Sequence, residues 1–411
     1  MNANITYNEF EMFLLLNNIK YIRLSFLDLL SQIRFITLPV SRKKEIYNNE
    51  ISFDGSSITG LKIDIDSDLY LHPDFSSMII LRYLNQQELT VNIFCDLYEN
   101  LTVPYANDGR GILKNYLNSL KEAYGYVFSI GLEIEFYLLD ENNLFIDNAS
   151  YFEVGDERCE KCIHEIISNL EKMKIEVRAF HHEVGPSQYE ISYNYDEPIK
   201  AIEQMVIIKD AIDKISKRHQ LKVSFNPKLK KGLPGNGLHL NLSIKDLNDN
   251  NLFADENIIS EFGKQFINGI LTHANEINLF ANTTDNSYLR LSDGLEAPRY
   301  ICYGLYNRTA MIRIPKSNNK KRRIEIRNPD HYLSCYIYVY LLIQAGLDGV
   351  NKKINTFEAM DPKKERDYSS LTLLPLNLLI AINKTKNSEF IHQVLSDTYL
   401  NLFITAQENK N

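Results

Sequence analysis

After about residue 130 the chain contains short segments in which apolar and charged residues alternate strictly. In "GLEIEFYLL", Glu133 and Glu135 fall on one side, and Leu132, Ile134 and Phe136 fall on the other. Side chains of a β-strand point alternately to its two faces, so such a segment predicts a strand with one apolar and one polar face. That alternation is typical of antiparallel sheets. A mainly antiparallel sheet is therefore the element around which this chain has to fold.

Four further segments repeat the pattern with the same kinds of polar side chain. "GLHLNLS" carries His239, Asn241 and Ser243 on one face. The polar faces of "AMIRIP" and "RRIEIR" carry Arg313, Arg323, Glu325 and Arg327. In "HHEVGPSQYEIS", Glu183 and Glu190 flank a Gly-Pro turn, so a hairpin would bring them side by side. A solvated face would explain any single strand, but five strands with repeated glutamate and arginine indicate a site.

These side chains suit metal-dependent phosphoryl chemistry. Carboxylates close together repel one another and raise one another's pKa, and a divalent cation relieves that conflict. Five glutamates and one histidine suit two hard cations, Mg²⁺ or Mn²⁺, better than zinc, which takes more nitrogen and sulfur ligands. Arginine binds phosphate and carboxylate groups through its fork of N–H donors. From the residues alone, a two-metal phosphohydrolase is a competing hypothesis.

The length of 411 residues favours two domains, or one large domain with a smaller partner. The first hundred residues predict a helix at 7–18, paired strands in "YIRLSFLDL" and "QIRFITLPV", and a strand in "ELTVNIFCDL". The polar segment "YENLTVPYANDGR" is the predicted linker, which divides the chain into 1–103 and 104–411. Beyond it we expect helices, with strands between them, at 111–123, 157–173, 198–219, 255–275 and 332–350.

A net charge of −8 argues against nucleic acid or an anionic membrane as the main partner. The N-terminal segment lacks the basic stretch of a signal peptide, and "LTLLPLNLLIAI" is too short to cross a bilayer. The five cysteines form no recognisable disulfide framework, which favours the cytoplasm. Cys159 and Cys162 form a CxxC, but their helical spacing with Ile163, Ile166 and Leu170 predicts a buried stripe rather than a zinc or redox site.

Seven motifs occur in order at sensible spacings: "SFDGSSITGLKIDIDSDLYLHPD", "GLEIEF", "AFHHEVGPSQYEIS", "GNGLHLNLS", "NSYLRL" with "LEAP", "NRTAMIRIP" and "RRIEIRNPD". Together they resemble type I glutamine synthetase over most of the chain. The resemblance implies an α+β fold, with a small N-terminal β-grasp domain and a large catalytic domain whose curved antiparallel sheet is flanked by helices. It also implies a cytoplasmic enzyme that phosphorylates the γ-carboxylate of glutamate with ATP and then joins ammonia to it, giving glutamine.

The resemblance assigns a role to each matching position. The implied ligands of two or more Mg²⁺ or Mn²⁺ ions are Glu133, Glu135, Glu183, Glu190, His239 and Glu325. The implied catalytic residues are Asp54, Glu296, Arg308 and Arg313. The implied glutamate-binding residues are Gly235, His239, Arg290, Glu296 and Arg327. The implied ATP-binding residues are Asn241, Ser243, Arg308, Lys320 and Arg323. The implied ammonium pocket consists of Asp54, Ser57, Tyr151 and Glu183.

Four points of the resemblance concern assembly, regulation and substrate. In the family, the aspartate matching Asp54 reaches the site of a neighbouring subunit, which implies a ring, either a hexamer or a dodecamer. The segment around "LFITAQENK" is shorter than the C-terminal segment of relatives, so a single ring is expected more than a double one. Thr372 stands where adenylylated relatives carry tyrosine, so no control by adenylylation is expected. Pro234 replaces an asparagine that helps hold the glutamate backbone, which leaves the identity of the amino acid open.

The stretch "GLPGNGLHLNLS" is rich in glycine but lacks the Lys-Ser/Thr end of a P-loop and leads into a strand. Its glycines are therefore expected to let the backbone approach the amino-acid substrate. Two alternatives to glutamine synthesis stay open: a γ-glutamyl-amine ligase that takes an organic amine, and a catalytically degenerate regulatory paralogue. The acidic groups of the ammonium pocket favour ammonium over an amine, and the complete set of metal-ligand positions argues against the paralogue.

Overall fold

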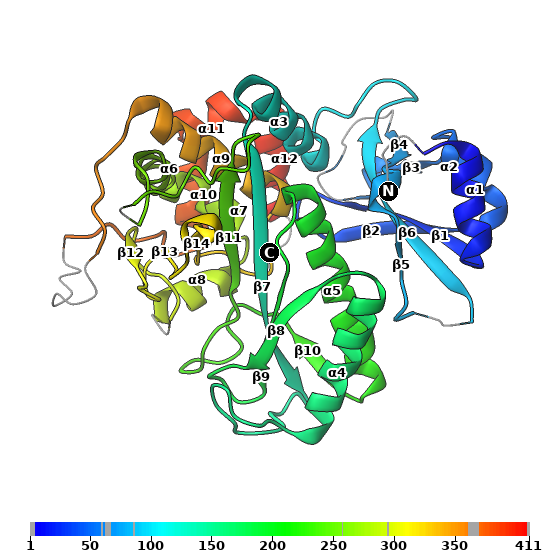
Figure 1. Ribbon diagram of the computed structural model, residues 1–411, viewed down its shortest axis with the longest axis horizontal. Helices are drawn as coiled ribbons and strands as arrows, with labels where there is room; N and C mark the ends of the chain where they lie inside the picture. Colours follow the sequence, from blue (N-terminus) through cyan, green and yellow to red (C-terminus); the bar gives the residue numbers. More distant parts are fainter. Residues whose placement is uncertain are drawn as a thin grey trace.

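The computed structural model describes residues 5–58, 61, 67–84, 87–256, 258–293, 296–360 and 370–408. These residues form two units, each built around its own sheet (Figure 1). The smaller, N-terminal unit lies at the right of the view, and the larger unit fills its centre and left. Both units combine a sheet with helices, as the predicted α+β class requires.

The N-terminal sheet has the strand order β2-β1-β6-β4-β3, with β5 paired to β6. Its strands are β1 (Ile19–Leu27), β2 (Ile33–Pro39), β3 (Ser52–Asp54), β4 (Asp68–Pro73), β5 (Ile79–Ile80) and β6 (Leu89–Tyr98). The predicted hairpin of β1 and β2 is confirmed, while β1 and β6 run parallel. The helix α1 (Tyr7–Leu16) begins with a capping box at Thr6 and, with α2 (Lys43–Tyr47), packs onto the core of this unit.

The larger sheet has the strand order β12-β13-β14-β11-β7-β9-β8, with β10 paired to β7. Its strands are β7 (Val127–Leu139), β8 (Val177–His182), β9 (Gln188–Tyr193), β10 (Lys222–Ser224), β11 (Leu238–Lys245), β12 (Tyr303–Leu305), β13 (Ile312–Ile314) and β14 (Ile324–Ile326). Among the described strand pairs of this larger sheet, only β12 and β13 run parallel. Ile134, Phe136, Leu240 and Leu242 are fully buried, so this face of β7 and β11 belongs to the core.

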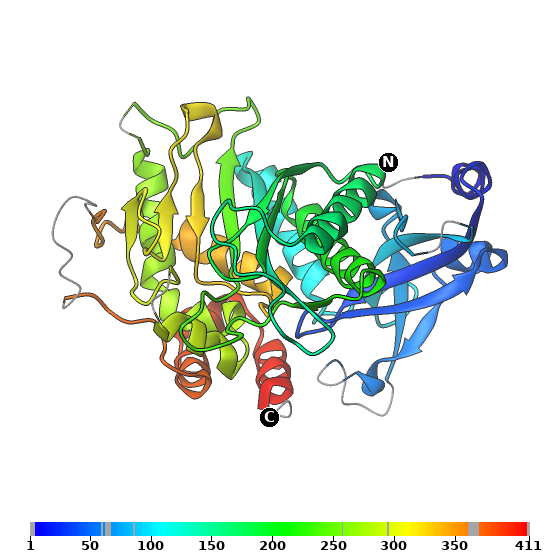
Figure 2. The ribbon, with the colours of Figure 1, turned by 90° about the horizontal axis from the view of Figure 1, so that it is seen from below.

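Helices cover the apolar face of the larger sheet and extend beyond it. They are α3 (Gly109–Tyr124), α4 (Glu157–Lys172), α5 (Pro198–Arg218), α6 (Glu261–Thr272), α7 (Ala274–Ala281), α8 (Asp285–Asp293), α9 (Cys335–Lys352), α10 (Leu378–Lys386), α11 (Glu389–Val394) and α12 (Asp397–Glu408). The helix α5 packs against β7 and β10, while α9 packs against α3, α6 and α7. The view from below shows α12 within the larger unit and α1 at the outer end of the smaller one (Figure 2).

Most of the predicted helices are confirmed to within a few residues, but the one expected at 255–275 is wrong at its start. The structure begins α6 at Glu261, because the side chain of Ser260 accepts a hydrogen bond from the backbone N–H of Gly263 and caps the helix. The chain then turns at His273 into the separate helix α7. A polar residue that caps a helix therefore set the boundary more strongly than the apolar spacing did.

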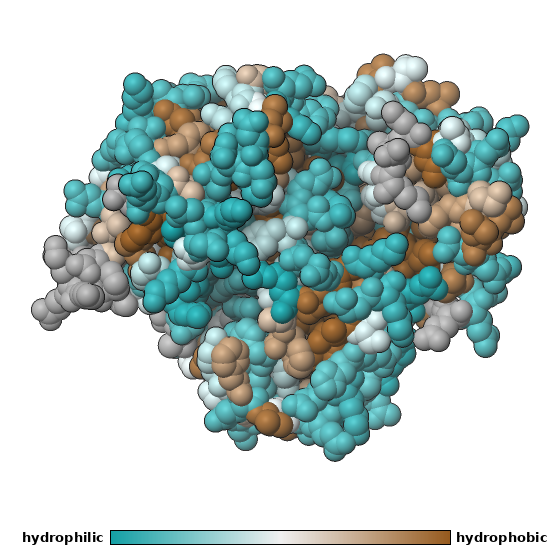
Figure 3. All heavy atoms as spheres, in the orientation of Figure 1, coloured by the Kyte–Doolittle hydropathy of each residue, from teal (hydrophilic) through white to brown (hydrophobic). Residues whose placement is uncertain are grey.

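The cysteine prediction is confirmed, since Cys159 and Cys162 are free thiols that lie fully buried on α4. In the part of the chain that the structure describes, every helix is too short or too polar to cross a membrane. The face drawn in Figure 3 is mainly hydrophilic, with smaller apolar patches between the charged and polar side chains.

Arg110 joins the two units through a buried cluster of charges. Its guanidinium lies 2.9 Å from Asp74 and 2.8 Å from Glu203 of α5, and it also pairs with Asp96 of β6. Lys114 adds a second cation next to Asp74 and Asp96. Because only 3% of the Arg110 side chain is exposed, its charge depends on these partners, and the cluster fixes how the two units sit against each other.

Candidate active site

The register of the larger sheet aligns the predicted metal ligands across four strands. Glu133 of β7 lies directly opposite His239 of β11, and Glu135 lies directly opposite Glu190 of β9. On the other side of β11, Glu325 of β14 lies opposite Asn241. Residues that face each other in an antiparallel pair are among the closest neighbours in a sheet. The predicted neighbourhood of these strands is therefore present.

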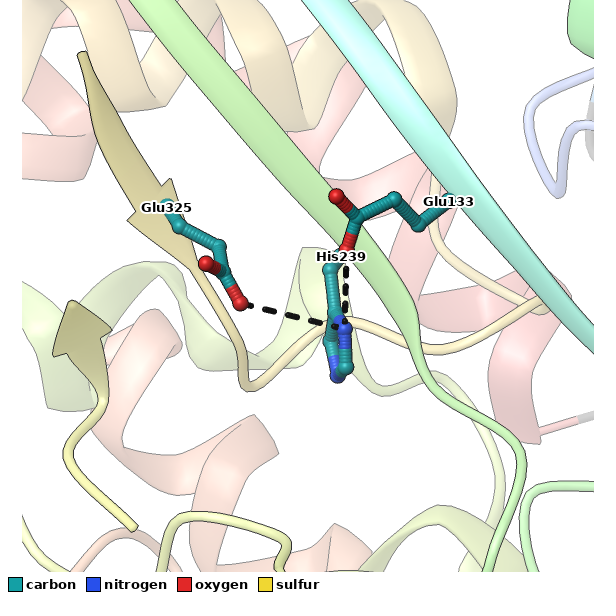
Figure 4. A group of neighbouring side chains, drawn as sticks. All are labelled: Glu133, His239 and Glu325. Atoms are coloured by element: carbon teal, nitrogen blue, oxygen red, sulfur yellow. Dashed lines mark ion pairs between the residues drawn. The ribbon is translucent and has the colours of Figure 1, made fainter. Parts of the chain in front are cut away.

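His239 lies at the centre of the first group of ligands (Figure 4). Its Nδ1 atom is 3.4 Å from Glu133 Oε2, 3.7 Å from Glu135 Oε1 and 4.0 Å from Glu325 Oε1. Ligand atoms of Glu133, His239 and Glu325 all lie within 4.8 Å of one another. Two carboxylates and one imidazole at this spacing fit a single divalent cation.

A second group of ligands lies on the β9 side of β7. Glu190 shares one group with Glu135 and His239, and another with His181 and Glu183, again with ligand atoms within 4.8 Å. The Nε2 atom of His181 is 2.8 Å from Glu183 Oε1. The hairpin of β8 and β9 thus brings Glu183 and Glu190 together, as the Gly-Pro turn predicted. Glu190 belongs to both groups on the β9 side, and His239 connects one of them to the group of Glu133 and Glu325. Such shared residues fit a pair of neighbouring cations.

Burial and crowding perturb the titration of these ligands. Burial, together with the nearby charge of Glu183, raises the pKa of Glu135 to about 8. Burial raises the pKa of Glu190 well above its usual range, and the surrounding glutamates raise it further. Burial and the neighbouring Arg327 hold the pKa of His239 well below its usual range, so its ring is neutral. A neutral imidazole and crowded carboxylates are the state in which a cation is bound most readily.

Arginines surround the ligand groups on the β14 side. Arg313 of β13 donates a hydrogen bond of 2.6 Å to Glu325, and Arg327 donates to the other oxygen of the same carboxylate. Arg323 donates through Nε to Asn241 Oδ1 at 2.9 Å, and Asn241 in turn donates to Glu133 at 3.1 Å. The predicted nucleotide and phosphate residues of these strands therefore form one chain of contacts with the metal ligands.

A pocket of about 320 Å³ opens beside the ligand groups. It is lined by Glu135, Glu183, Val184, Gln188, Pro234, Gly235, His239, Arg290, Glu296, Ala297, Thr309 and Arg327. A Cβ atom on Gly235 would lie 2.3 Å from the carbonyl oxygen of Pro227, so only glycine fits there. Arg290 is 3% exposed and its two terminal nitrogens donate to the carbonyls of Arg327 and Asn328. The pocket therefore combines the positive charges of arginine side chains with a stretch of backbone at Gly235 that carries no side chain of its own.

Of two further predicted residues, Glu296 lines this pocket and Arg308 directly precedes the lining residue Thr309. Glu296 is exposed, lines the pocket and has a left-handed backbone with φ of 59°. Its carbonyl oxygen accepts a hydrogen bond of 3.2 Å from Arg327. Arg308 is exposed as well and lies against the hydroxyl of Tyr151, which is also near Glu183. Because both side chains are exposed, Glu296 and Arg308 can contact a substrate from the solvent side of the site.

The structure leaves other predicted residues apart from the pocket. Asp54 ends β3 in the N-terminal unit, where it is exposed and accepts hydrogen bonds from Ser56, Ser57 and Ser67. Those hydrogen bonds, led by that of Ser56, lower the pKa of Asp54 below its usual range, so it stays ionised. Lys320 is exposed on the short helix η4 (Asn319–Lys321), and Ser243 lies further along β11. None of these residues lines the described pocket.

The pocket also contains residues that the sequence did not single out, among them Val184, Gln188, Ala297 and Thr309. Gln188 had a readable signal, because it stands two positions before Glu190 on the same strand and therefore on the same face. His181 had the equivalent signal before Glu183. The spacing of two residues therefore also predicts the faces on which Gln188 and His181 lie.

Comparisons with known proteins agree with this architecture. A family model described as "Glutamine synthetase, beta-Grasp domain" matches residues 18–100, and one described as "Glutamine synthetase, catalytic domain" matches residues 106–410. The glutamine synthetase of Staphylococcus aureus (strain MW2) is 33% identical over 406 residues, which cover 95% of this chain and 91% of the relative. The glutamine synthetase of Staphylococcus epidermidis is 31% identical over an alignment of 419 residues, gaps included. The alignment covers 98% of this chain and 94% of the relative.

Solved structures show the same fold. The ADP complex of GmaS matches with a TM-score of 0.86 at 25% identity, over 97% of this chain and 94% of that one. The cryoEM structure of Plasmodium falciparum glutamine synthetase matches with a TM-score of 0.87 at 21% identity, over 100% of this chain and 96% of that one. The predicted β-grasp unit and catalytic unit are confirmed. With matches over both units and relatives that span nearly its whole length, the chain belongs to the glutamine synthetase family of ligases.

Proposed function

We propose that this enzyme uses ATP to join ammonia to the γ-carboxylate of L-glutamate through a γ-glutamyl phosphate, giving L-glutamine, ADP and phosphate. The observation that carries the proposal is the convergence of five glutamates and His239 beside a pocket with two buried arginines. Carboxylates that can hold cations, next to arginines that can hold anions, suit the transfer of a phosphoryl group to a carboxylate.

The ligand groups divide between two cation sites in this proposal. Glu133, His239 and Glu325 would hold one ion, and the other would be held by Glu135, Glu183 and Glu190. Mg²⁺ or Mn²⁺ bound there would neutralise charge on the phosphoryl group. Arg313 donates a hydrogen bond to the Glu325 carboxylate. In this proposal, Arg313 and Arg308 together contact the phosphoryl group. Both arginines are assigned this role by their positions at the edge of the ligand groups.

The nucleotide is assigned to the β11–β14 side of the site. Arg323 and Asn241 contact each other there, and Asn241 contacts the metal ligand Glu133. Ser243 is included in this assignment because it lies on β11 with Asn241. Lys320 is included because it lies on η4, three positions before Arg323. The similarity to the structure of a GmaS complex with ADP supports a nucleotide site in this fold.

Glutamate is assigned to the pocket itself. Its carboxylates would be bound by Arg290 and Arg327, and Gly235 would let the backbone approach the substrate. Glu296 stands at the mouth of the pocket, where it can close over bound substrate. The pocket lining carries both carboxylates and arginines, which suits an amino acid that has an ammonium group as well as two carboxylates.

Ammonium is assigned to Glu183 and Tyr151 of one chain together with Asp54 and Ser57 of a neighbouring chain in a ring. Asp54 is exposed and ionised, which suits a residue that attracts a cation and accepts its proton. Mixing an Asp54→Asn chain with a Glu190→Gln chain should restore activity, because some sites then combine two intact halves. Activity that stays absent after mixing and reassembly would contradict a shared site.

Product detection tests the proposed reaction. Purified protein would receive ATP, Mg²⁺ and glutamate with ammonium or with a panel of amines, and the products would be identified by mass. We expect glutamine and ADP from the ammonium reaction. Formation of a γ-glutamylamide from one amine without glutamine would exclude ammonia as the acceptor, and absence of ATP turnover with every acceptor would favour the regulatory paralogue.

One observation favours an organic amine as the second candidate. The rings of Tyr151 and Phe152 are stacked with centroids 4.1 Å apart, and both meet His181 edge-on beside Glu183. Exposed aromatic rings next to a carboxylate can bind an alkylammonium group through cation–π contacts. The amine panel therefore includes methylamine and longer alkylamines, and Phe152→Ala should lower their use selectively if this candidate is correct.

A further inference from the structure

The glycine loop at residues 234–237 is held at successive backbone groups by the strands next to it. The hydroxyl of Tyr137 donates a hydrogen bond of 2.7 Å to the carbonyl oxygen of Pro234. The side-chain nitrogen of Gln188 donates one of 3.1 Å to the carbonyl oxygen of Gly235. The backbone N–H of Gly237 then donates to Glu135 Oε2 at 2.7 Å. A loop with glycines needs such contacts, because glycine itself restricts the backbone little.

Tyr137 and Gln188 occupy one rung of the sheet. They lie directly opposite each other in the β7–β9 pair, two positions along from the opposed pair Glu135 and Glu190. Because the period of a strand is two, all four side chains point to the same face. The rung that holds the loop is therefore rigidly connected to the rung that supplies two of the proposed metal ligands.

Gln188 also connects the loop to the turn after Glu183. Its Oε1 atom accepts a hydrogen bond of 3.1 Å from the backbone N–H of Gly185, and its nitrogen donates to Asn236 Oδ1 at 3.0 Å. Asn236 in turn donates to the carbonyls of Ser224 and Asn226. Gln188 is 1% exposed and Asn236 is fully buried, so water cannot replace a lost partner.

We propose that Tyr137 and Gln188 are positioning residues that hold the carbonyls of Pro234 and Gly235 in place and thereby set the affinity of the pocket for its amino acid. The inference rests on the proposed function in that the amino acid is taken to lie against Gly235. Proline has a fixed φ and no N–H, so Pro234 offers only its carbonyl to be held. Glu135 contacts the loop through the N–H of Gly237, beyond the two carbonyls that are held. Binding of metal and nucleotide is therefore expected to be affected less than binding of the amino acid.

The test compares Tyr137→Phe and Gln188→Met with the matched control Tyr193→Phe. Tyr193 lies on the same strand as Gln188, is 1% exposed and donates a hydrogen bond of 2.7 Å to the backbone carbonyl of Ala201, away from the loop. Hydrogen–deuterium exchange of the peptide over 233–241 is measured on unliganded protein. KM for glutamate and the binding constants of ADP and Mn²⁺ are then measured for each chain.

We expect faster exchange in the loop peptide and a rise of about five-fold in KM for glutamate in each loop variant, with ADP and Mn²⁺ binding close to wild type. The control should lose stability without either change. Unchanged exchange in both loop variants, or equal losses of glutamate, ADP and Mn²⁺ binding, would overturn the proposal. If wild-type protein makes no γ-glutamyl product, the proposed function fails, but the exchange measurement still decides whether the two side chains hold the loop.

Discussion

Replacement of Glu135 by glutamine should stabilise the metal-free protein while it removes a proposed metal ligand. Glu135 is nearly buried, lies opposite Glu190 and approaches His239. The new amide is neutral and nearly the same size, and its oxygen can still accept the hydrogen bond from Gly237. Its nitrogen can donate to the carboxylate of Glu190, so no buried polar group is left without a partner. The substitution thus removes the cost of either burying a charge or taking up a proton at this position, because the amide is neutral at every pH.

The magnitude follows from the pKa of the carboxyl group. Burial and Glu183 raise the pKa of Glu135 from 4.5 to about 8. An acid with a raised pKa makes no pH-dependent contribution below pH ~4.5, and its destabilising effect grows as the pH rises toward about 8. At pH 7 the folded chain has to take up a proton that the unfolded chain lacks, which costs about 3 kcal/mol. Glu135→Gln should recover a large part of this free energy of unfolding.

The assay is chemical denaturation at several pH values, with EDTA or with Mn²⁺. In EDTA we expect Glu135→Gln to be more stable than wild type at pH 7, by up to about 3 kcal/mol, and the difference to shrink toward pH 5. Mn²⁺ should stabilise wild type more than the variant, because ligands that bind the native state shift its stability. Glu141→Gln, at an exposed position just beyond β7, controls for net charge. A variant less stable than wild type in EDTA would refute the reasoning.

Two further predictions concern parts of the fold away from the pocket. Arg110→Met leaves three buried or half-buried carboxylates without their shared cation, so the free energy of unfolding should fall by about 3–5 kcal/mol in urea denaturation. Burial opposes protonation of His273, but hydrogen bonds to Glu276 and Asp348 outweigh it and raise its pKa. That stabilisation is complete below pH ~6.5 and is lost as the pH rises through the raised pKa, so wild type but not His273→Gln should lose stability there.

The metal-ligand strands could be predicted because their signal is local. A period of two along "GLEIEF" and "GLHLNLS" assigns Glu133, Glu135 and His239 to a face, whatever the rest of the chain does. The pairing of these strands is not local, since residues 140–237, with α4, β8, β9, α5 and β10 among them, separate β7 from β11. That these strands lie together was therefore implied only by the family resemblance.

Residues held by backbone contacts were harder to predict. The spacing of Gln188 to Glu190 shows which face it takes, but the sequence does not show that the loop at 234–237 folds back onto Gln188 and Tyr137. Asp54 was assigned only through the resemblance, and a single chain places it far from the pocket, on the sheet of the other unit. A sequence pattern predicts the face of the strand on which a side chain lies. The roles of Tyr137, Gln188 and Asp54 depend instead on which loop or neighbouring chain packs against that face.

The same alternation that makes the site also fixes the register that builds it. Leu132, Ile134 and Phe136 are at most 2% exposed, so the face of β7 opposite the glutamates lies in the main core. A slip of one residue would turn Glu133 and Glu135 into that core and the apolar side chains into the pocket. Burying two unpaired carboxylates costs far more than burying the apolar residues in their places. Slips of β7 by an odd number of residues are therefore disfavoured, because they would bury the charges that the site requires.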